Sequence, residues 1–143
     1  MTSQYLEADL IRDEGEELIA YLDSLGNVTW GIGHKDNSVA VGTVFMQSQV
    51  DAQFQIDKNA AIAGISGALP WWPTLDDLRQ DVLVNMTFNM GLAGVLGFHR
   101  TLTFIEDSDW EDAAAGMLAS KWAGQVGARA TRLAEQMRTG VHQ

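Results

Sequence analysis

Apolar residues near the N-terminus recur at helical spacing. Tyr5, Leu6, Leu10 and Ile11 would share one face of a helix over residues 4–13, and Gly15 is a typical helix stop. After this glycine the pattern changes, because strand-forming residues flank the turn signal "LGN". We therefore predict a hairpin or small three-stranded sheet over about 19–34. The following stretch "KDNSVAVGTVF" is typical of a loop that can carry one more short strand.

The rest of the chain has the periodicity of helices. Apolar positions alternate with charged ones at helical spacing, and Gly67 and Pro70 interrupt the pattern after its first helical segment. We predict helices over 47–65, 76–90, 100–106, 110–119 and 129–138, with a short buried segment at 93–98. Strands at one end and helices elsewhere indicate an α+β, mostly α-helical fold.

The composition fits one globular domain. The chain has 143 residues, 46% hydrophobic and 20% charged, and no cysteine, so its stability must come from packing without disulfides. No apolar run approaches the roughly 20 residues that span a bilayer, and the N-terminus "MTSQYLEADL" lacks the pattern of a signal peptide. We therefore expect no membrane anchor. The paired Trp71 and Trp72 are expected to pack at a boundary within the fold.

The net charge of −10 makes non-specific binding to nucleic acid unfavourable. Nucleic acid is therefore not an expected partner. Arg129, Arg132 and Arg138 nevertheless crowd the C-terminal region, and together with Lys35 and Arg100 they could form a local basic rim.

Acidic residues gather around the predicted hairpin. Glu14 ends the first helix, Asp23 lies nine positions later beside the turn, and Thr29 lies six further on. A hairpin would bring Asp23 and Thr29 together, and two carboxylates in different environments suit acid-catalysed bond cleavage. The neighbouring Asp13, like Glu16 and Glu17, is expected to be solvated.

A metal site has little support. The chain has three histidines, none four residues from another, so no metal or cofactor is predicted. His34 alone is more typical of a hydrogen-bonded structural histidine.

The ordered set around Glu14 resembles a known motif. Glu14-Gly15, Asp23, Thr29 and Gly31-Ile32-Gly33-His34 match, in type and spacing, the N-terminal motif of the T-even phage lysozyme family, glycoside hydrolase family 24. The resemblance continues in Phe88-Asn89-Met90-Gly91, Gly97-Phe98 and Thr101-Leu102, in "DWEDAAAGMLASKW" and in "GARATRLAEQMRTG". It spans about residues 5–140, with the middle supported by pattern more than by motif.

The resemblance implies a lysozyme-like, two-lobed fold within a single domain over 1–143. The small β-sheet lobe would span about 13–46 and the joining helix about 47–66. The helical lobe would span about 67–143 and include the N-terminal helix. The short link after His34 suggests that the small lobe is trimmed compared with the family.

The resemblance also implies a muramidase, which cleaves the β-1,4 bond between N-acetylmuramic acid and N-acetylglucosamine. Glu14 would be the general acid, while Asp23 and Thr29 would hold the attacking water. Three further residues correspond to substrate-cleft positions: Lys35, Phe88 and Thr101. Three would have supporting roles: His34 would brace the sheet, Arg129 would pair with Glu14, and Asn89 would support the cleft.

The expected partner is bacterial peptidoglycan, and the expected state is a monomer. A phage endolysin of this kind would accumulate in the host cytoplasm until a holin releases it to the wall. Two alternatives stay open: a lysozyme-like protein that binds the wall without cleaving it, and a transglycosylase or chitinase-like hydrolase. The presence of Glu14, Asp23 and Thr29 together argues against the first, and Asp23 argues against a transglycosylase.

Overall fold

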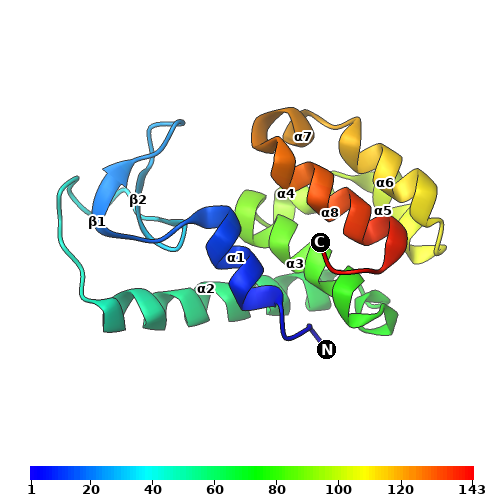
Figure 1. The fold of residues 1–143 in the computed structure, drawn as a ribbon, viewed down its shortest axis with the longest axis horizontal. Helices are drawn as coiled ribbons and strands as arrows, with labels where there is room; N and C mark the ends of the chain where they lie inside the picture. The colour runs from blue at the N-terminus through cyan, green and yellow to red at the C-terminus, as the bar shows by residue number, and fades with distance from the viewer.

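The computed structural model describes all residues from Met1 to Gln143, and it combines a small sheet with many helices (Figure 1). The elements are α1 (Leu6–Glu14), β1 (Glu17–Leu22), β2 (Val28–Gly31), β3 (His34–Lys35), α2 (Gln47–Ala68), a 3-10 turn η1 (Trp72–Thr74), α3 (Asp77–Met90), α4 (Leu92–Leu96), α5 (His99–Glu106), α6 (Trp110–Leu118), α7 (Lys121–Val126) and α8 (Ala128–Thr139). This arrangement confirms the predicted lysozyme-like α+β class, with the strands confined to the N-terminal part.

The three strands form one antiparallel sheet in the order β1-β2-β3. Tyr21 lies opposite Thr29 in the first pair of strands, and Trp30 lies opposite His34 in the second. The predicted loop after the sheet contains no further strand, but a single bridge joins Ile19 to Val44. The hairpin is therefore confirmed, and its first strand begins before the predicted position 19.

Helix α2 runs along the molecule from the sheet to the helical part (Figure 1). Its buried residues Val50, Phe54, Ala61 and Ile65 share one face. Near the sheet, Gly31 approaches Val50, and near the helical part Phe54 meets Phe88 edge-on at 5.9 Å between ring centroids. One long helix thus fixes the sheet relative to the helices.

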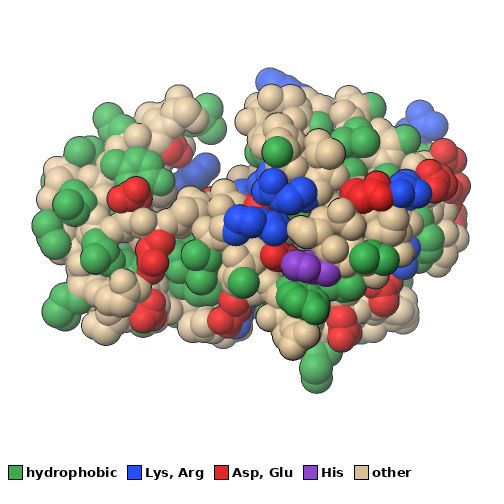
Figure 2. All heavy atoms as spheres, viewed as in Figure 1, with side chains coloured by type: hydrophobic (Ala, Val, Ile, Leu, Met, Phe, Trp, Pro, Cys, Tyr) green, Lys and Arg blue, Asp and Glu red, His purple; other side chains and the backbone are tan.

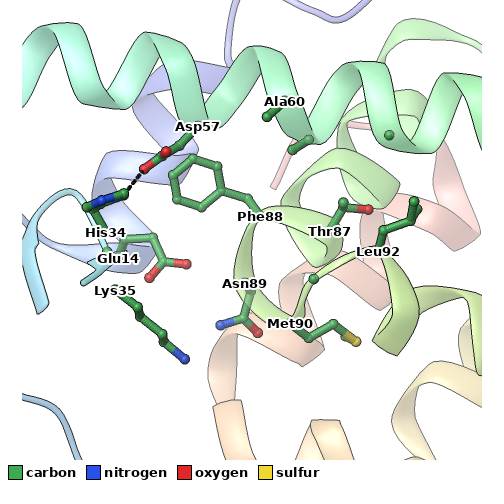
Figure 3. A pocket seen from close by; sticks show the side chains of 14 residues that line it. Glu14, His34, Lys35, Asp57, Ala60, Thr87, Phe88, Asn89, Met90 and Leu92 are labelled. Atoms are coloured by element: carbon green, nitrogen blue, oxygen red, sulfur yellow. Dashed lines mark hydrogen bonds and ion pairs between the residues drawn. The ribbon is translucent and has the colours of Figure 1, made fainter. Parts of the chain in front are cut away.

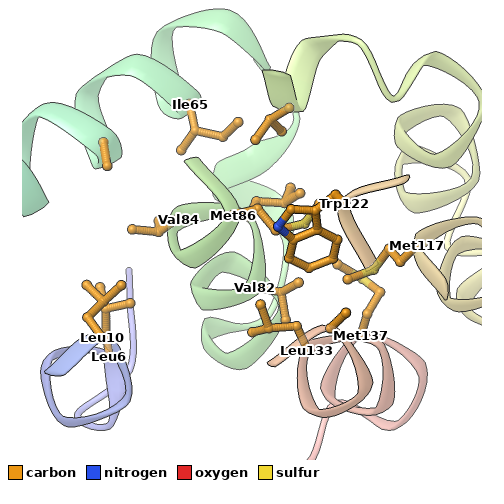
Figure 4. Close-up of a cluster of buried hydrophobic side chains, with 14 of the residues drawn as sticks. Leu6, Leu10, Ile65, Val82, Val84, Met86, Met117, Trp122, Leu133 and Met137 are labelled. Carbon is orange, nitrogen blue, oxygen red and sulfur yellow. The ribbon is translucent and has the colours of Figure 1, made fainter. Parts of the chain in front are cut away.

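The main core surrounds α3, whose residues from Gln80 to Thr87 are all buried (Figure 4). A helix buried on every side cannot show a one-sided apolar pattern, so its polar residues must find partners inside. The amide nitrogen of Gln80 does so, because it donates to the carbonyls of Trp72, Pro73 and Leu75, whereas its Oε1 has no partner. Trp72 is itself buried, as expected for a packing residue at this boundary.

The C-terminal segment returns to the first helix. The ring of His142 stacks on that of Tyr5 with centroids 4.0 Å apart, and its Nε2 lies 3.0 Å from both carboxylate oxygens of Asp9. The Arg12 guanidinium also donates to the Gln143 carbonyl. These contacts attach the end of the chain to α1.

Helix α7 was not among the predicted helices. It begins at a side-chain cap, because the hydroxyl of Ser120 accepts a hydrogen bond from the Ala123 amide. It ends at Gly127, whose φ of 58° few other residues adopt. Throughout the chain, no helix is both long and apolar enough to cross a lipid bilayer.

Candidate active site

Two adjoining pockets lie between the sheet and the helical part, and their volumes are about 500 and 540 Å³. The two pockets share five of their lining residues and so form one continuous cleft. The shared residues are Glu14, Gly33, Lys35, Asn89 and Met90. Figure 2 shows the surface hollowed between the strand-bearing end and the helical end, and Figure 3 shows the first pocket from close by. Glu14, the last residue of α1, therefore lies where the two pockets meet.

Glu14 reaches the cleft because α1 ends immediately after it. Gly15, with a φ of 73°, closes the helix by donating to the Ile11 carbonyl. The Glu14 side chain is only 14% exposed, and its Oε1 lies 2.8 Å from Nη1 of Arg129. The direction of this ion pair does not meet hydrogen-bond geometry, so Oε1 has no hydrogen-bond partner within the protein. The predicted pairing of Arg129 with Glu14 is present.

The side chain of Asp13 is inaccessible to solvent, contrary to the expectation that it would be solvated. Its carboxylate is 0% exposed and accepts hydrogen bonds from Arg12, Asn85 and Arg132. Asn85 in turn accepts a hydrogen bond of 2.9 Å from Nε of Arg129. A chain of polar contacts thus runs from Asp13 through Asn85 and Arg129 to Glu14.

The charge of Asp13 is stabilised by these partners. Burial alone would raise its pKa, but hydrogen bonds from Arg12, Asn85 and Arg132, with the charge of Arg129, lower the pKa overall. The residues of this network are far apart in the sequence, so no local motif indicates it. Neither Asn85 nor Arg132 was predicted to take part.

Asp23 is held at the tip of the hairpin. Its Oδ1 accepts backbone hydrogen bonds from Leu25 at 2.9 Å and Asn27 at 2.8 Å. The bond from the Asn27 backbone is the main cause that lowers the pKa of Asp23, and Leu25 and Lys35 act in the same direction. The turn therefore keeps this carboxylate ionised and leaves Oδ2 facing Lys35, 3.9 Å from its ammonium nitrogen.

Thr29 lies on the central strand β2 and is buried. Its Cα is paired with Tyr21 on one side and Lys35 on the other, and its hydroxyl donates to the Asn27 carbonyl at 3.2 Å. Thr29 lines the second pocket together with Glu14 and Asp23. The structure thus brings all three predicted catalytic residues to one pocket.

His34 has the partners of a bracing residue. Its Nδ1 lies 2.7 Å from Asp57 on α2, as Figure 3 shows, and its ring meets Trp30 edge-on at 5.1 Å. Asp57 was not predicted, since a carboxylate within a helix gives no sign of a distant histidine partner. This contact joins the sheet to α2 beside the cleft.

The opposite wall of the cleft comes from the end of α3. Phe88 and Asn89 line the first pocket, and the Asn89 carbonyl accepts a 2.8 Å hydrogen bond from the indole of Trp122. The indole therefore orients the Asn89 amide and leaves its NH₂ group available to a ligand. Trp122 also lines the second pocket and was not among the predicted site residues.

Thr101 is not brought to this cleft. It is buried on α5 and packs against Gly116 of α6, where a β-carbon would overlap its hydroxyl. It lines a separate pocket with Arg100 and Phe104. The match in sequence motif therefore does not place Thr101 beside Glu14.

The C-terminal arginines do not form the expected basic rim. Arg129 pairs with Glu14, Arg132 pairs with Asp13 at 2.6 Å, and Arg138 contacts Glu111 and Glu135. Their charges are directed toward carboxylates of the same chain. None of the three lines the cleft, so Lys35 is the only residue of the predicted rim that does.

The cleft has two carboxylates in different environments, as acid–base catalysis on an uncharged substrate requires. It contains the largely enclosed carboxylate of Glu14, whose Oε1 is buried without a hydrogen-bond partner, and the carboxylate of Asp23, which the turn keeps charged. No group of three or more His, Cys, Asp or Glu residues that could hold a metal ion is present.

The comparisons with known proteins agree with this architecture. The chain is 31% identical to "Probable T4-type lysozyme 2" of Dictyostelium discoideum, over 90% of this chain and 91% of that protein. It is 31% identical to the "Endolysin" of Salmonella phage P22, over 81% and 80% of the two chains. It is also 31% identical to the "Pre-baseplate central spike protein Gp5" of Enterobacteria phage T4, over 92% of this chain but 27% of that protein.

The family model described as phage lysozyme matches residues 12–137. This match includes Glu14, Asp23 and Thr29 as well as the α3 wall of the cleft. Since it covers well over half of the chain, the protein belongs to the phage lysozyme family.

Proposed function

We propose that this protein is a muramidase that hydrolyses the β-1,4 bond between N-acetylmuramic acid and N-acetylglucosamine in peptidoglycan. The observation that carries the proposal is the meeting of Glu14, Asp23 and Thr29 at one pocket of about 540 Å³. Family membership supports a lysozyme, and the similarity to proteins named lysozyme and endolysin supports peptidoglycan as the substrate.

Glu14 acts as the general acid in this proposal. Its side chain is 14% exposed and lies where the two pockets meet. A substrate that fills the cleft would displace water and bring the glycosidic oxygen within reach of Glu14. The ion pair with Arg129 constrains the direction of the side chain, and Gly33 leaves room for its carboxylate.

Asp23 and Thr29 act on the water side. Asp23 uses Oδ1 for the hydrogen bonds of the turn, which leaves Oδ2 to accept a proton from the attacking water. The Thr29 hydroxyl can orient that water as a hydrogen-bond acceptor while it donates to the Asn27 carbonyl. Attack from the face opposite the acid would invert the anomeric carbon, so the first product would be the α-anomer.

Phe88, Asn89 and Lys35 bind the sugar in this proposal. Phe88 offers an apolar ring surface, and Asn89 offers an amide oriented by Trp122. The two alternatives, wall binding without cleavage and a transglycosylase, lack a specific supporting observation, because each would leave the water-side pair of Asp23 and Thr29 unused.

The experiment compares the wild type with Glu14→Gln on purified peptidoglycan. The wild type should release products with reducing N-acetylmuramic ends, identified by mass, and Glu14→Gln should lose this activity because it removes the proton donor. Glu106→Gln is the matched control, since it makes the same chemical change at an exposed position at the end of α5.

Three results would reject the proposal in different ways. Anhydro-muramic products would identify a transglycosylase instead. Binding to the wall without any products would identify a non-catalytic protein. Full activity in a correctly folded Glu14→Gln variant would exclude Glu14 as the acid.

We also propose a role in bacterial lysis during phage growth, supported by the similarity to the P22 endolysin. The similarity to a spike protein of phage T4 supports a second role, attached to the virion. Detection of the protein in purified particles by mass spectrometry would favour the second role, and its restriction to the infected-cell lysate would favour the first.

A further inference from the structure

Lys35 is the only Lys or Arg side chain that lines the cleft, and it lines both pockets. The carboxylates around it are Glu14, Asp23 and Asp57. Within a protein of net charge −10, this cleft would repel an anionic ligand unless a cation offset the repulsion. The position of Lys35 therefore bears directly on which glycans the cleft accepts.

The Lys35 ammonium is available to a ligand. Its side chain is 49% exposed, and its ion pair with Asp23 is 3.9 Å long, which is beyond hydrogen-bond distance. Elsewhere in the chain, Lys58 is tightly paired, since its ammonium lies 2.6 Å from Glu7 and its side chain is 15% exposed. Figure 3 shows Lys35 extending into the open space that Glu14 and Asn89 also face.

Asp23 does not depend on Lys35 for its partners. Its Oδ1 already accepts two backbone hydrogen bonds within the turn, from Leu25 and Asn27. A half-exposed ion pair at this distance contributes little to stability. Neither the structure of the turn nor the stability of the fold therefore requires a lysine at position 35.

We propose that Lys35 binds a carboxylate of the muramyl unit and so makes the cleft selective for anionic glycan. This inference rests on the proposed muramidase function. Muramyl units carry a carboxylate either on the lactyl group or on the attached stem peptide, whereas a polymer of N-acetylglucosamine alone carries none. An ammonium group is a strong donor to a carboxylate, and the half-open cleft gives such a group room to approach.

The test measures binding in the full chain with Glu14→Gln as background, so that the wall is not consumed. Glu14→Gln alone is compared with Glu14→Gln plus Lys35→Gln on three forms of peptidoglycan. The first is intact. The second is stripped of stem peptides by an amidase, which leaves the lactyl carboxylate free. The third is amidated with carbodiimide, so that its carboxylates are neutral.

We expect Lys35→Gln to weaken binding to intact peptidoglycan about tenfold, the equivalent of about 1.4 kcal/mol. The weakening should disappear on the amidated wall. If it persists on the stripped glycan, the lactyl carboxylate is a ligand, and if it is confined to intact wall, the stem peptide supplies the ligand. Lys35→Arg should retain binding, because it keeps the positive charge.

Lys121→Gln is the charge-matched control, since Lys121 is exposed at the start of α7 and lines neither pocket. An equal loss on all three substrates, or the same loss in Lys121→Gln, would overturn the inference. Failure of the muramidase proposal would look different. The wild type would then release no reducing ends, while the difference in binding between intact and amidated wall could still be measured.

Discussion

The carboxylate of Glu14 occupies the space that a β-carbon would fill at Gly33. A side chain at this position would overlap Oε2, and the backbone φ of 65° is itself unfavourable for other residues. Gly33 thus serves the cleft in two ways, because it makes the bend after β2 and admits the acid. The second glycine of the Gly-x-Gly-His stretch is explained by this contact.

Gly33→Ala should therefore lose activity more than stability. Displacement of a catalytic group by about 1 Å can cost on the order of 100-fold in rate, so kcat is expected to fall by that order. The control is Gly42→Ala, which has a φ of 90° but nothing within 4 Å of the added carbon. That variant should lose about 1–2 kcal/mol of stability from backbone strain and keep its activity. Equal activities in the two variants would contradict the role of the contact.

Asp13→Asn should be strongly destabilising. It replaces a buried carboxylate that accepts hydrogen bonds from Arg12, Asn85 and Arg132. Loss of one partner from a buried ion pair typically costs about 3–5 kcal/mol. Denaturant unfolding at pH 7 would measure this loss, with Asp107→Asn at an exposed site as the control. A change below about 1 kcal/mol would mean that the network does not support the fold.

The pH dependence of stability should reflect Asp13 and Asp81 with opposite signs. The pKa of Asp13 is lowered in the folded state, so its contribution is present above the unfolded pKa of about 3.9 and is lost as the pH falls through the folded pKa. The pKa of Asp81 is raised by burial, despite hydrogen bonds from Ser3. Its contribution is present below the unfolded value and is lost as the pH rises through the folded pKa.

Asp81→Asn should therefore unfold at a higher temperature than the wild type at pH 7. Asn can still accept from the Ser3 amide and can donate to its hydroxyl, while it removes a buried charge. The gain should shrink as the pH falls below about 4, where Asp81 is protonated in both states. Thermal unfolding from pH 3 to 7 tests this trend, and a gain that is independent of pH would refute it.

Arg129→Lys should lower kcat with little change in KM. Arg129 uses Nε for Asn85 and Nη1 for Glu14, and a single ammonium group cannot reproduce this fork. Loss of orientation at Glu14 is expected to lower kcat on the order of 100-fold. Arg138→Lys is the control, because Arg138 pairs at the surface with Glu135 and Glu111. A rise in KM alone would indicate a role in substrate binding instead.

On the acid side, the rate should fall only at a pH below the ordinary pKa of an aspartate. Backbone hydrogen bonds from Asn27 and Leu25 lower the pKa of Asp23, so it stays ionised below the ordinary aspartate range of about 3.9. Asp23→Asn should lower the rate about 100–10,000-fold, the usual contribution of a general base. Rates on a soluble glycan across pH would test both statements. An acid limb that stays in place when Asn27 is replaced by proline, which removes the donor, would exclude this cause.

Local pattern predicted much of the fold, because most elements end at residues with a strong local preference. Gly15 ends α1 and Gly91 ends α3, and both have the positive φ that few other residues adopt. Helix α7 escaped prediction, since its six residues are too few to show a period and only the cap at Ser120 marked its start.

The site was predictable only where its residues form an ordered motif. Glu14, Asp23 and Thr29 were selected by their match to the family motif, and they line one pocket because the hairpin and the helix end before it bring them together. Asp13 and Asn85 were missed, because their contact joins α1 to α3 across 72 positions of sequence. Burial decides whether an acid is solvated or paired, and no local pattern reports the burial of Asp13.

The stacking of Tyr5 on His142 holds the two ends of the chain beside each other. A fold whose ends meet can be inserted into a surface loop of a longer polypeptide without being pulled apart. The alignment with the T4 spike protein covers 27% of that protein. Because the termini are close, the chain should tolerate circular permutation. A short linker would join the present termini, and the new termini would lie in the exposed loop around Ser38.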